Sequence, residues 1–259
     1  MSAEPPAATR RFSGRSSAYA RARPGYPQEM FDHLFSVGAL FLGARVTDLG
    51  SGTGIFTELL LDRGLMVHAV EPNEDMRRLA ESRLWERAGF SSVAGRAERT
   101  TLPDGSVDAV TAAQAFHWFD VEATRDEMRR ILRPGGQVIM VWNNRERDLD
   151  EFHRAFSELM DEHARGKEEV DSLRKDIQDR FFPHGYHISQ FHHSKEYDLE
   201  TLECLAVSAS YMPKEGEDGY DGMMSGLCRV FSEHQVGGKV RLHYRTDCYH
   251  GRLEELDTQ

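Results

Sequence analysis

The segment VTDLGSGTG at residues 46–54, followed by IFTELLLDRG at residues 55–64, decides the fold of this chain. Its apolar start predicts a short buried strand, its glycines predict a tight turn, and the residues after them have the spacing of a helix. Gly50, Gly52 and Gly54 lack a Cβ atom, so a ligand can approach the backbone beside the free N–H groups of the helix start. The segment therefore predicts a strand-turn-helix unit with a ligand at the turn.

Two acidic residues indicate which ligand the turn accepts. Dinucleotide enzymes use a G-x-G-x-x-G turn, in which the helix dipole faces a pyrophosphate. Here the spacing is G-x-G-x-G, and Asp48 precedes the first glycine, where it would repel an anion. Glu71 ends the next expected strand, LMVHAVEPN, where a carboxylate can accept both hydroxyls of an unphosphorylated ribose. The pattern favours a positively charged ligand that carries a ribose.

Together these residues resemble motifs I and II of the class I S-adenosylmethionine-dependent methyltransferases. The resemblance implies an α/β fold: a Rossmann-like, doubly wound sheet of seven strands, six parallel and one antiparallel, with helices on both faces and a helical lid. It also implies S-adenosyl-L-methionine as cofactor and S-adenosyl-L-homocysteine as product. In this chain it assigns cofactor binding to Asp48, Gly50, Ser51, Gly52, Thr53, Gly54, Glu71 and Pro72.

The composition excludes several other classes of protein. The chain has 259 residues, with 32 Lys and Arg against 43 Asp and Glu, a formal charge of −11. No basic stripe interleaved with aromatic residues is present, which argues against a nucleic-acid partner. Cys204, Cys228 and Cys248 form no C-x-x-C pair, so we expect neither a disulfide framework nor a metal site, and we infer a reducing cytoplasm. No apolar run is long enough for a membrane span or a signal core, so we expect no membrane partner.

The N-terminal region predicts two helices that cover the cofactor. Residues 1–11 are small, polar and proline-rich, and we expect them to be disordered. A helix over residues 16–22 should end before Pro24, and a second should start after Pro27.

The run YARARPGYP, residues 19–27, resembles an N-terminal signature of one small-molecule methyltransferase group, usually closer to YARYRPxYP. Ala22 departs from that signature and removes an aromatic side chain. The resemblance implies that Tyr19 and Arg23 reach the methionine carboxylate and that Tyr26 contacts the substrate. Packing tyrosines and solvated arginines are an equally good interpretation.

The residues after Glu71 predict a helix with Asn73 as its N-cap. In the family, the residue at the position of Met76 packs against adenine, although Met76 also suits a core. A Pro-Asp-Gly turn at residues 103–105 separates two short strands. Between these strands, Ala97 and Glu98 match the positions that bind the edge of the adenine in the family. The match rests on position alone, and an exposed Glu98 with no role in binding is the alternative interpretation.

The segment VDAVTAAQAFHWFD predicts a strand and a loop, and Asp120 can cap a following helix over residues 121–132. Pro134-Gly135-Gly136 should stop that helix before a strand over residues 137–142. This order resembles motifs IV to VI of the methyltransferase domain 11 group, which includes trans-aconitate methyltransferase and its relatives.

The ends of these strands should face the ligand crevice, as in other doubly wound sheets. The resemblance implies that Gln114 and Ala115 contact the cofactor. For the substrate we expect Trp118, Phe119 and Trp142 as contacts and His117 as the catalytic residue, although an aromatic cluster can also be core. His117 would act as a base on a hydroxyl or an acidic carbon, or would orient an acceptor that is already ionised.

We expect one domain over residues 12–259: covering helices at 12–40, the cofactor-binding core at 41–145, a helical lid at 146–183 and the rest of the sheet at 184–259. In the charged lid, Phe152 and Phe156 are expected on a lid or dimer surface rather than in a core. We expect the protein to be a monomer or a homodimer. Two helices, the first capped by Asp198, and two strands should complete the C-terminal part. His192 and His193 lack companion ligands and are expected on the surface.

The sequence thus predicts methyl transfer from S-adenosylmethionine to a small organic molecule, with a carboxylate or a hydroxyl as candidate acceptors. An RNA or protein methyltransferase is less consistent with the acidic charge and with the lack of an N-P-P-Y-like strand end. A catalytically silent cofactor-binding scaffold would not need intact glycines, Asp48 and Glu71. A pyridine-nucleotide reductase conflicts with Asp48.

Overall fold

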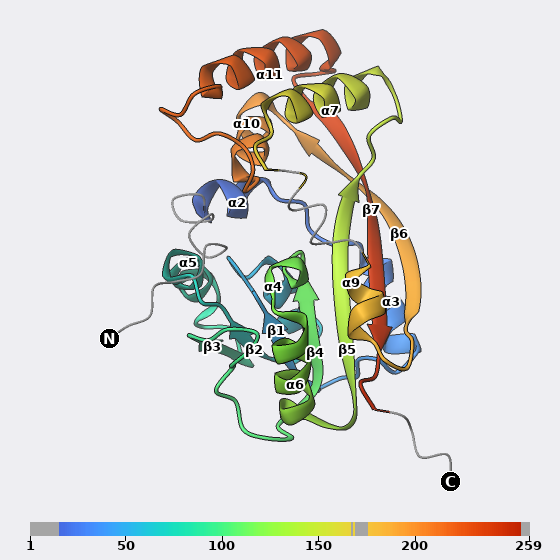
Figure 1. Cartoon of the computed structure of the whole chain (residues 1–259). Coiled ribbons are helices and arrows are strands. Elements are labelled where there is room, and N and C mark those ends of the chain that lie inside the picture. The colour runs from blue at the N-terminus through green and yellow to red at the C-terminus, as the bar shows by residue number, and fades with distance from the viewer. Residues whose placement is uncertain (1–15, 167, 169–175, 255–259) are drawn as a thin grey trace.

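A computed structural model describes residues 16–166, 168 and 176–254 of the chain (Figure 1). Its centre is one seven-stranded sheet with the order β3-β2-β1-β4-β5-β7-β6. Every neighbouring pair is parallel except the two that involve β7, which is antiparallel to β5 and to β6. The predicted α/β sheet of six parallel strands and one antiparallel strand is confirmed. The strands are β1 (Arg45–Leu49), β2 (Met66–Val70), β3 (Phe90–Val93), β4 (Val107–Ala113), β5 (Leu132–Arg145), β6 (His187–Tyr197) and β7 (Val240–Gly251).

Helices cover both faces of this sheet. The apolar cores assign α3 (Gln28–Ser36), α4 (Ile55–Leu61) and α5 (Glu74–Leu84) to one face, and α6 (Val121–Ile131) and α9 (Ile177–Phe181) to the other. A short 3-10 helix, η1 (Phe116–Trp118), follows β4. No helix of the described ranges is long and apolar enough to cross a membrane.

Three predicted N-caps are confirmed by their hydrogen bonds. The side chain of Asn73 accepts from the Met76 amide at 3.1 Å. Asp120 caps α6, and Asp198 caps α10 by accepting from the Thr201 amide at 2.9 Å. Each cap satisfies an amide that the first turn of a helix leaves without an internal partner.

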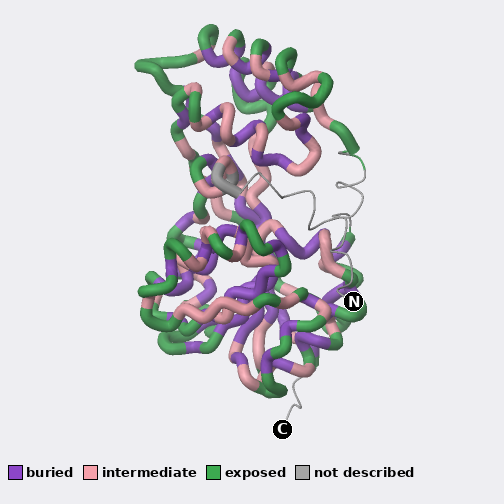
Figure 2. The backbone as a smooth tube through the Cα atoms, turned by 90° about the vertical axis from the view of Figure 1, so that its left-hand side faces the viewer, coloured by how far each residue is buried: buried purple, intermediate pink, exposed green. Residues whose placement is uncertain are grey.

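A second layer, which we call the cap, lies beyond one end of the sheet (Figure 1). It consists of α2 (Ser16–Ala22), α7 (Glu151–His163), α10 (Leu199–Ser208), α11 (Tyr220–His234) and the adjoining ends of β6 and β7. Its own apolar core includes Phe156, Leu202, Leu227 and Leu242, all fully buried. Figure 2 shows buried backbone in the cap and in the body around the sheet.

The structure corrects several expectations about this region. Phe152 and Phe156 lie in the core of the cap and not on a lid or dimer surface, because α11 packs over α7. The two helices expected in the C-terminal part are present as α10 and α11, and both belong to the cap. His192 is exposed as expected, but His193 is half-buried and stacks on Tyr244 with 5.2 Å between ring centroids.

We expected the glycines after α6 to separate this helix from the next strand, but they lie within that strand. The helix ends at Ile131, and β5 starts at once, with Leu132 paired to Val107 before a shift in register. At its other end β5 continues to Arg145, three residues beyond the predicted strand, because it pairs with β7 up to Tyr244. The predicted disordered residues 1–11 lie outside the described residues.

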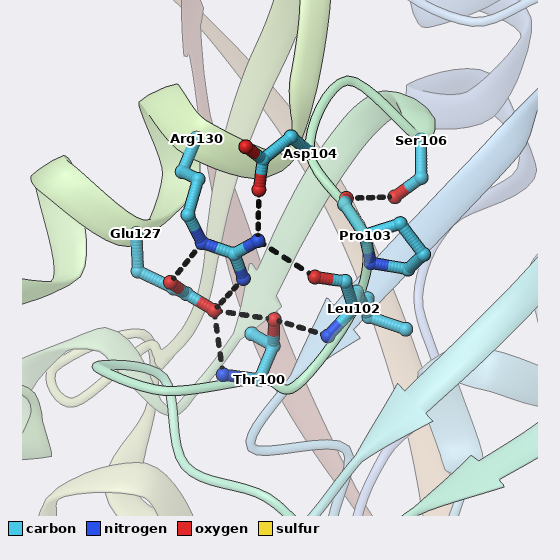
Figure 3. Close-up of polar contacts among 7 residues, drawn as sticks. All are labelled: Thr100, Leu102, Pro103, Asp104, Ser106, Glu127 and Arg130. Carbon is cyan, nitrogen blue, oxygen red and sulfur yellow. Dashed lines mark hydrogen bonds and ion pairs between the residues drawn. The ribbon is translucent and has the colours of Figure 1, made fainter.

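A polar cluster fixes the loop between β3 and β4 to α6 (Figure 3). One carboxylate oxygen of Glu127 accepts from the Thr100 amide at 2.7 Å and from its hydroxyl at 2.6 Å. Arg130 donates to both oxygens of Glu127, at 2.7 and 2.9 Å, and to Asp104 at 2.5 Å. Burial opposes ionisation of Glu127, but these hydrogen bonds outweigh it and lower its pKa to about 2.

Candidate functional site

A cavity of about 490 Å³ lies between the cap and the ends of the strands that point toward it. The ends of parallel strands are where doubly wound sheets bind ligands. Three groups of residues line it: the N-terminal segment with Arg23, Pro24 and Tyr26; the strand ends with Asp48, Gly50, Ser51, Gly52, Thr53, Ile55, Phe56, Ala113, Gln114, His117, Trp118, Asn143, Asn144, Arg145 and Arg147; and the cap with Leu205, Ser210, Tyr211 and Tyr244.

Gly52 and Gly54 are needed in the glycine turn for different reasons. Gly50, Gly52 and Gly54 all have positive φ, at 64°, 56° and 81°. A Cβ on Gly54 would lie 2.7 Å from the Leu84 side chain, so this glycine allows α4 and α5 to pack. A Cβ on Gly52 would meet only the Met76 sulfur at 3.7 Å and the Gly50 carbonyl at 4.0 Å. Gly52 therefore leaves open space beside the backbone, which suits a ligand that approaches closely.

Glu71 connects the end of β2 to this turn. Its carboxylate accepts from the Gly52 amide at 2.9 Å and from the Asn73 amide at 2.7 Å. Burial raises the pKa of Glu71 to about 7, although these two amides and Arg77 act in the opposite direction. The glycine turn and a carboxylate with a raised pKa are thus held together at one edge of the cavity.

Asp48 is almost fully buried under the turn. Its carboxylate accepts from the Thr57 hydroxyl at 2.7 Å and from the Thr111 hydroxyl at 3.0 Å. Burial raises the pKa of Asp48 to about 6, and the two threonines oppose that shift. Asp48 therefore orders β1, α4 and β4 around the turn in addition to lining the cavity.

The end of β4 carries a backbone conformation that is unusual for a residue with a side chain. Gln114 has φ of 58°, its amide donates to the Val141 carbonyl at 2.8 Å, and its side chain donates to the Asn143 carbonyl at 2.9 Å. Such conformations persist where the surroundings enforce them, commonly at functional sites. The chain then turns into η1, which places His117 and Trp118 in the cavity wall.

The structure brings together many of the predicted site residues but leaves others outside the cavity. The predicted residues that do not line it are Gly54, Glu71, Pro72, Met76, Ala97, Glu98, Ala115, Phe119 and Trp142. The side chain of Tyr19 lies outside the described residues, although its backbone belongs to α2.

Two of these residues are held elsewhere by contacts of their own. Trp142 is buried in the core and makes an edge-to-face contact with Tyr249, with 5.5 Å between centroids, so it packs in the core and does not line the cavity. Glu98 accepts from the Asp120 amide at 3.1 Å and pairs with Arg96 at 3.2 Å. The surroundings of Glu98 therefore show a structural role at the start of α6.

Sequence reasoning missed the residues that follow Trp142. Asn143, Asn144 and Arg145 line the cavity because β5 continues toward the cap. The rule that strand ends face the crevice could have found them, had the strand been extended to Arg145. Tyr211 and Tyr244 come from distant segments, and no local signal marks them.

Comparison with known proteins agrees with this geometry. Residues 47–140, which carry the glycine turn, Glu71 and the end of β4, match the family model described as a methyltransferase domain. This segment therefore belongs to a methyltransferase domain, in agreement with the resemblance to the class I S-adenosylmethionine-dependent methyltransferases. The narrower resemblance to trans-aconitate methyltransferase relatives stays a prediction.

Relatives in other organisms carry the same general description. An uncharacterized methyltransferase of Mycobacterium tuberculosis is 43% identical over 138 residues, which cover 53% of this chain and 54% of that protein. The chain thus spans about half the length of the first relatives it matches. An uncharacterized methyltransferase of Schizosaccharomyces pombe is 26% identical over 249 residues, covering 93% of this chain and 96% of that protein.

A solved structure shares the methyltransferase fold. A candidate type II methyltransferase from Anaeromyxobacter dehalogenans superposes with a TM-score of 0.68 at 23% identity, and covers 89% of this chain and 98% of that one. At this identity the likeness supports the fold alone.

Proposed function

We propose that the protein transfers a methyl group from S-adenosylmethionine to a small organic molecule bound in the cavity under the cap. The observation that carries the proposal is the contact between Glu71 and the Gly52 amide, which joins a buried carboxylate to an open glycine turn. A sulfonium-bearing nucleoside offers two ribose hydroxyls to the carboxylate and no phosphate that Asp48 would repel.

The residues present fit this cofactor. Gly52 leaves room for a ligand to press against the backbone, and Glu71 has a carboxylate that can accept hydroxyl donors. Arg23, which also lines the cavity, lies in the segment that links α2 to α3, and its guanidinium can hold a carboxylate. When bound, S-adenosylmethionine supplies an activated methyl group, because the C–S bond breaks with its electrons going to the positively charged sulfur.

The chain's own residues would position the acceptor and exclude water. Trp118, Tyr26 and Tyr211 provide flat apolar walls, and the cap covers the strand ends. Holding the acceptor in line with the methyl group accounts for most of the catalysis that such a reaction needs. His117 would take the proton of an acceptor hydroxyl, or would orient an acceptor that is already ionised.

The position of the cavity beneath the cap supports a small acceptor over a macromolecule. Residues of the cap, including Leu205, Ser210 and Tyr211, form one side of the cavity, so a folded RNA or a protein side chain would have to enter beneath the cap. The formal charge of −11 also disfavours a phosphate backbone. We further propose that the protein is cytoplasmic, since all three cysteines are free. We also propose that it acts as a monomer or a homodimer.

Calorimetry and a transfer assay test the proposal in sequence. The full chain is titrated with S-adenosylhomocysteine and, separately, with NADH. Binding of the first and not the second is expected, and the reverse result would favour a reductase. Radiolabelled S-adenosylmethionine is then incubated with panels of small carboxylates, phenols, thiols and indoles and with bulk RNA. Label transferred only to RNA would refute a small acceptor, and tight binding with no transfer to any panel would favour a silent scaffold.

A further inference from the structure

Arg145 stands at the point where the sheet passes into the cap. It is the last residue of β5, and it pairs in register with Tyr244 of β7. Its guanidinium lies over the ring of Phe156, 4.5 Å from the centroid, and the residue lines the cavity. The end of a strand and a packed ring therefore hold a cation at the cavity wall.

This cation lacks the partner that a buried guanidinium usually has. Among the described residues, no acceptor lies within hydrogen-bond distance of its buried Nε, and no carboxylate lies within 4 Å of its guanidinium nitrogens. Its hydrogen bond to the Ser157 hydroxyl is long, at 3.5 Å. The neighbouring Arg147, in contrast, is paired with Asp161. Burying a charged donor without an acceptor is costly, so a ligand that provides the acceptor would remove that cost.

The cavity wall beside Arg145 consists of neutral groups, and Asp161, an acid that acts on Arg145 from beyond ion-pair distance, is paired with Arg147. Tyr244 lines the cavity beside it and shares a hydrogen bond of 2.8 Å with Tyr197, while Tyr211 and Leu205 complete the wall. Burial raises the pKa of Tyr244 to about 12, so this hydroxyl stays neutral.

The charges of the cavity are divided between its two sides. Asp48 is the acidic residue of the described lining, against Arg23, Arg145 and Arg147. Asp48 belongs to the glycine-turn side, where Thr57 and Thr111 hold its oxygens. Because Arg147 is paired with Asp161, the cation that the end of β5 offers to an anion in the described lining is Arg145.

We propose that Arg145 binds the negatively charged group of the methyl acceptor, which is a small organic acid with an apolar body. This inference rests on the proposed function and names the substrate class of the same cavity. The planar guanidinium would donate to a carboxylate, while Trp118, Tyr211 and Leu205 pack against the body of the acid.

Binding of paired probes tests this assignment. The full chain, saturated with S-adenosylhomocysteine, is titrated by calorimetry with benzoate, 3-phenylpropionate and glutarate, and with the amide of each. At least one acid should bind tenfold or more tightly than its amide. Arg145→Met should abolish that preference, and Arg145→Lys, which keeps the charge without the fork, should retain part of it. Arg154→Met is the matched control, because Arg154 is an exposed arginine of α7, and it should keep the full preference.

The possible results separate the alternatives. If every acid binds no better than its amide, or none binds, the proposal is overturned even though the cofactor binds. An Arg145→Met protein with a lower melting temperature but an unchanged acid preference would mean that Arg145 only packs on Phe156. Weaker binding of S-adenosylhomocysteine itself would mean that Arg145 holds the cofactor's carboxylate instead. Should Arg145→Met not fold, the wild type and Arg145→Lys decide. Failure of the proposed function shows differently, as no binding of S-adenosylhomocysteine in the first titration.

Discussion

Glu71 should make cofactor binding dependent on pH. In the free protein, burial raises the pKa of its carboxyl to about 7, so much of it is protonated in mildly acidic solution. A cofactor whose ribose hydroxyls donate to Glu71 binds the ionised carboxylate better, because a carboxylate accepts stronger hydrogen bonds than a neutral acid. Binding then releases a proton, and affinity falls as the pH falls through the pKa of the free protein.

The magnitude follows from the pKa of about 7 and from the contacts of the carboxylate. Each pH unit below that value weakens binding up to ~10-fold, so the loss between pH 8 and pH 5 reaches ~100-fold. At pH 8, Glu71→Gln should cost about 2 to 3 kcal/mol of binding free energy, because two hydroxyls lose a charged acceptor. Glutamine would also turn an NH₂ group toward the Gly52 or Asn73 amide, which adds a stability loss to be measured separately.

Calorimetric titration with S-adenosylhomocysteine at pH 5, 6, 7 and 8 measures this linkage. The wild type should show the slope, Glu71→Gln should lose most of it, and Glu74→Gln should keep it, because Glu74 is an exposed glutamate at the start of α5. Asp48, with its pKa of about 6, can contribute to the lower part of the slope, and Asp48→Asn isolates that share. An affinity that does not change with pH in the wild type, or an unchanged slope in Glu71→Gln, would refute the role of Glu71.

Three further changes test the structure. The pKa of Glu127 is about 2 in the folded protein, below its ordinary value of 4.5, so its stabilisation is present above pH 4.5 and is lost as the pH falls toward 2. Glu127→Gln should therefore lower the free energy of unfolding in urea by about 1 to 2 kcal/mol at pH 7, since Arg130 is partly solvated, and by much less at pH 3; an equal loss at both values would contradict this. Gly52→Val should lose calorimetric binding of S-adenosylhomocysteine, with about 1 to 2 kcal/mol of stability lost to strain at a φ of 56°; retained binding would show that the turn needs only its torsion. His117→Asn should leave cofactor affinity unchanged and lower turnover of an identified acceptor by ~100-fold; a lower melting temperature with normal turnover would make His117 structural.

The parts of the fold that depend on local chemistry could be predicted from the sequence. The glycine turn follows from positive φ at Gly50, Gly52 and Gly54, and helix starts follow from short polar caps such as Asn73 and Asp120. These signals require only neighbours along the chain. The seven-stranded sheet with one antiparallel strand was expected from the family resemblance, and it is confirmed.

The parts that depend on distant segments could not be predicted. Arg145 lies beyond the strand expected at residues 137–142, and it belongs to β5 only because β7, about a hundred residues later, supplies the partner strand. Trp142, one of the aromatic residues expected near substrate, is drawn into the core by Tyr249. In both cases a tertiary contact overrides what the local pattern indicates.

The cap and the body share strands. β6 and β7 pair along their whole lengths, from His187 opposite His250 near the body to Tyr197 opposite Val240 in the cap, so one continuous ladder runs through both layers (Figure 1). Melting the cap would strip partners from β5 and β7, and melting the body would leave the cap helices on unsupported hairpin tips. The two layers should therefore unfold in one cooperative transition. The same shared ladder ties the cap to the body, so rotation of the whole cap would have to distort the pairing of β6 with β7.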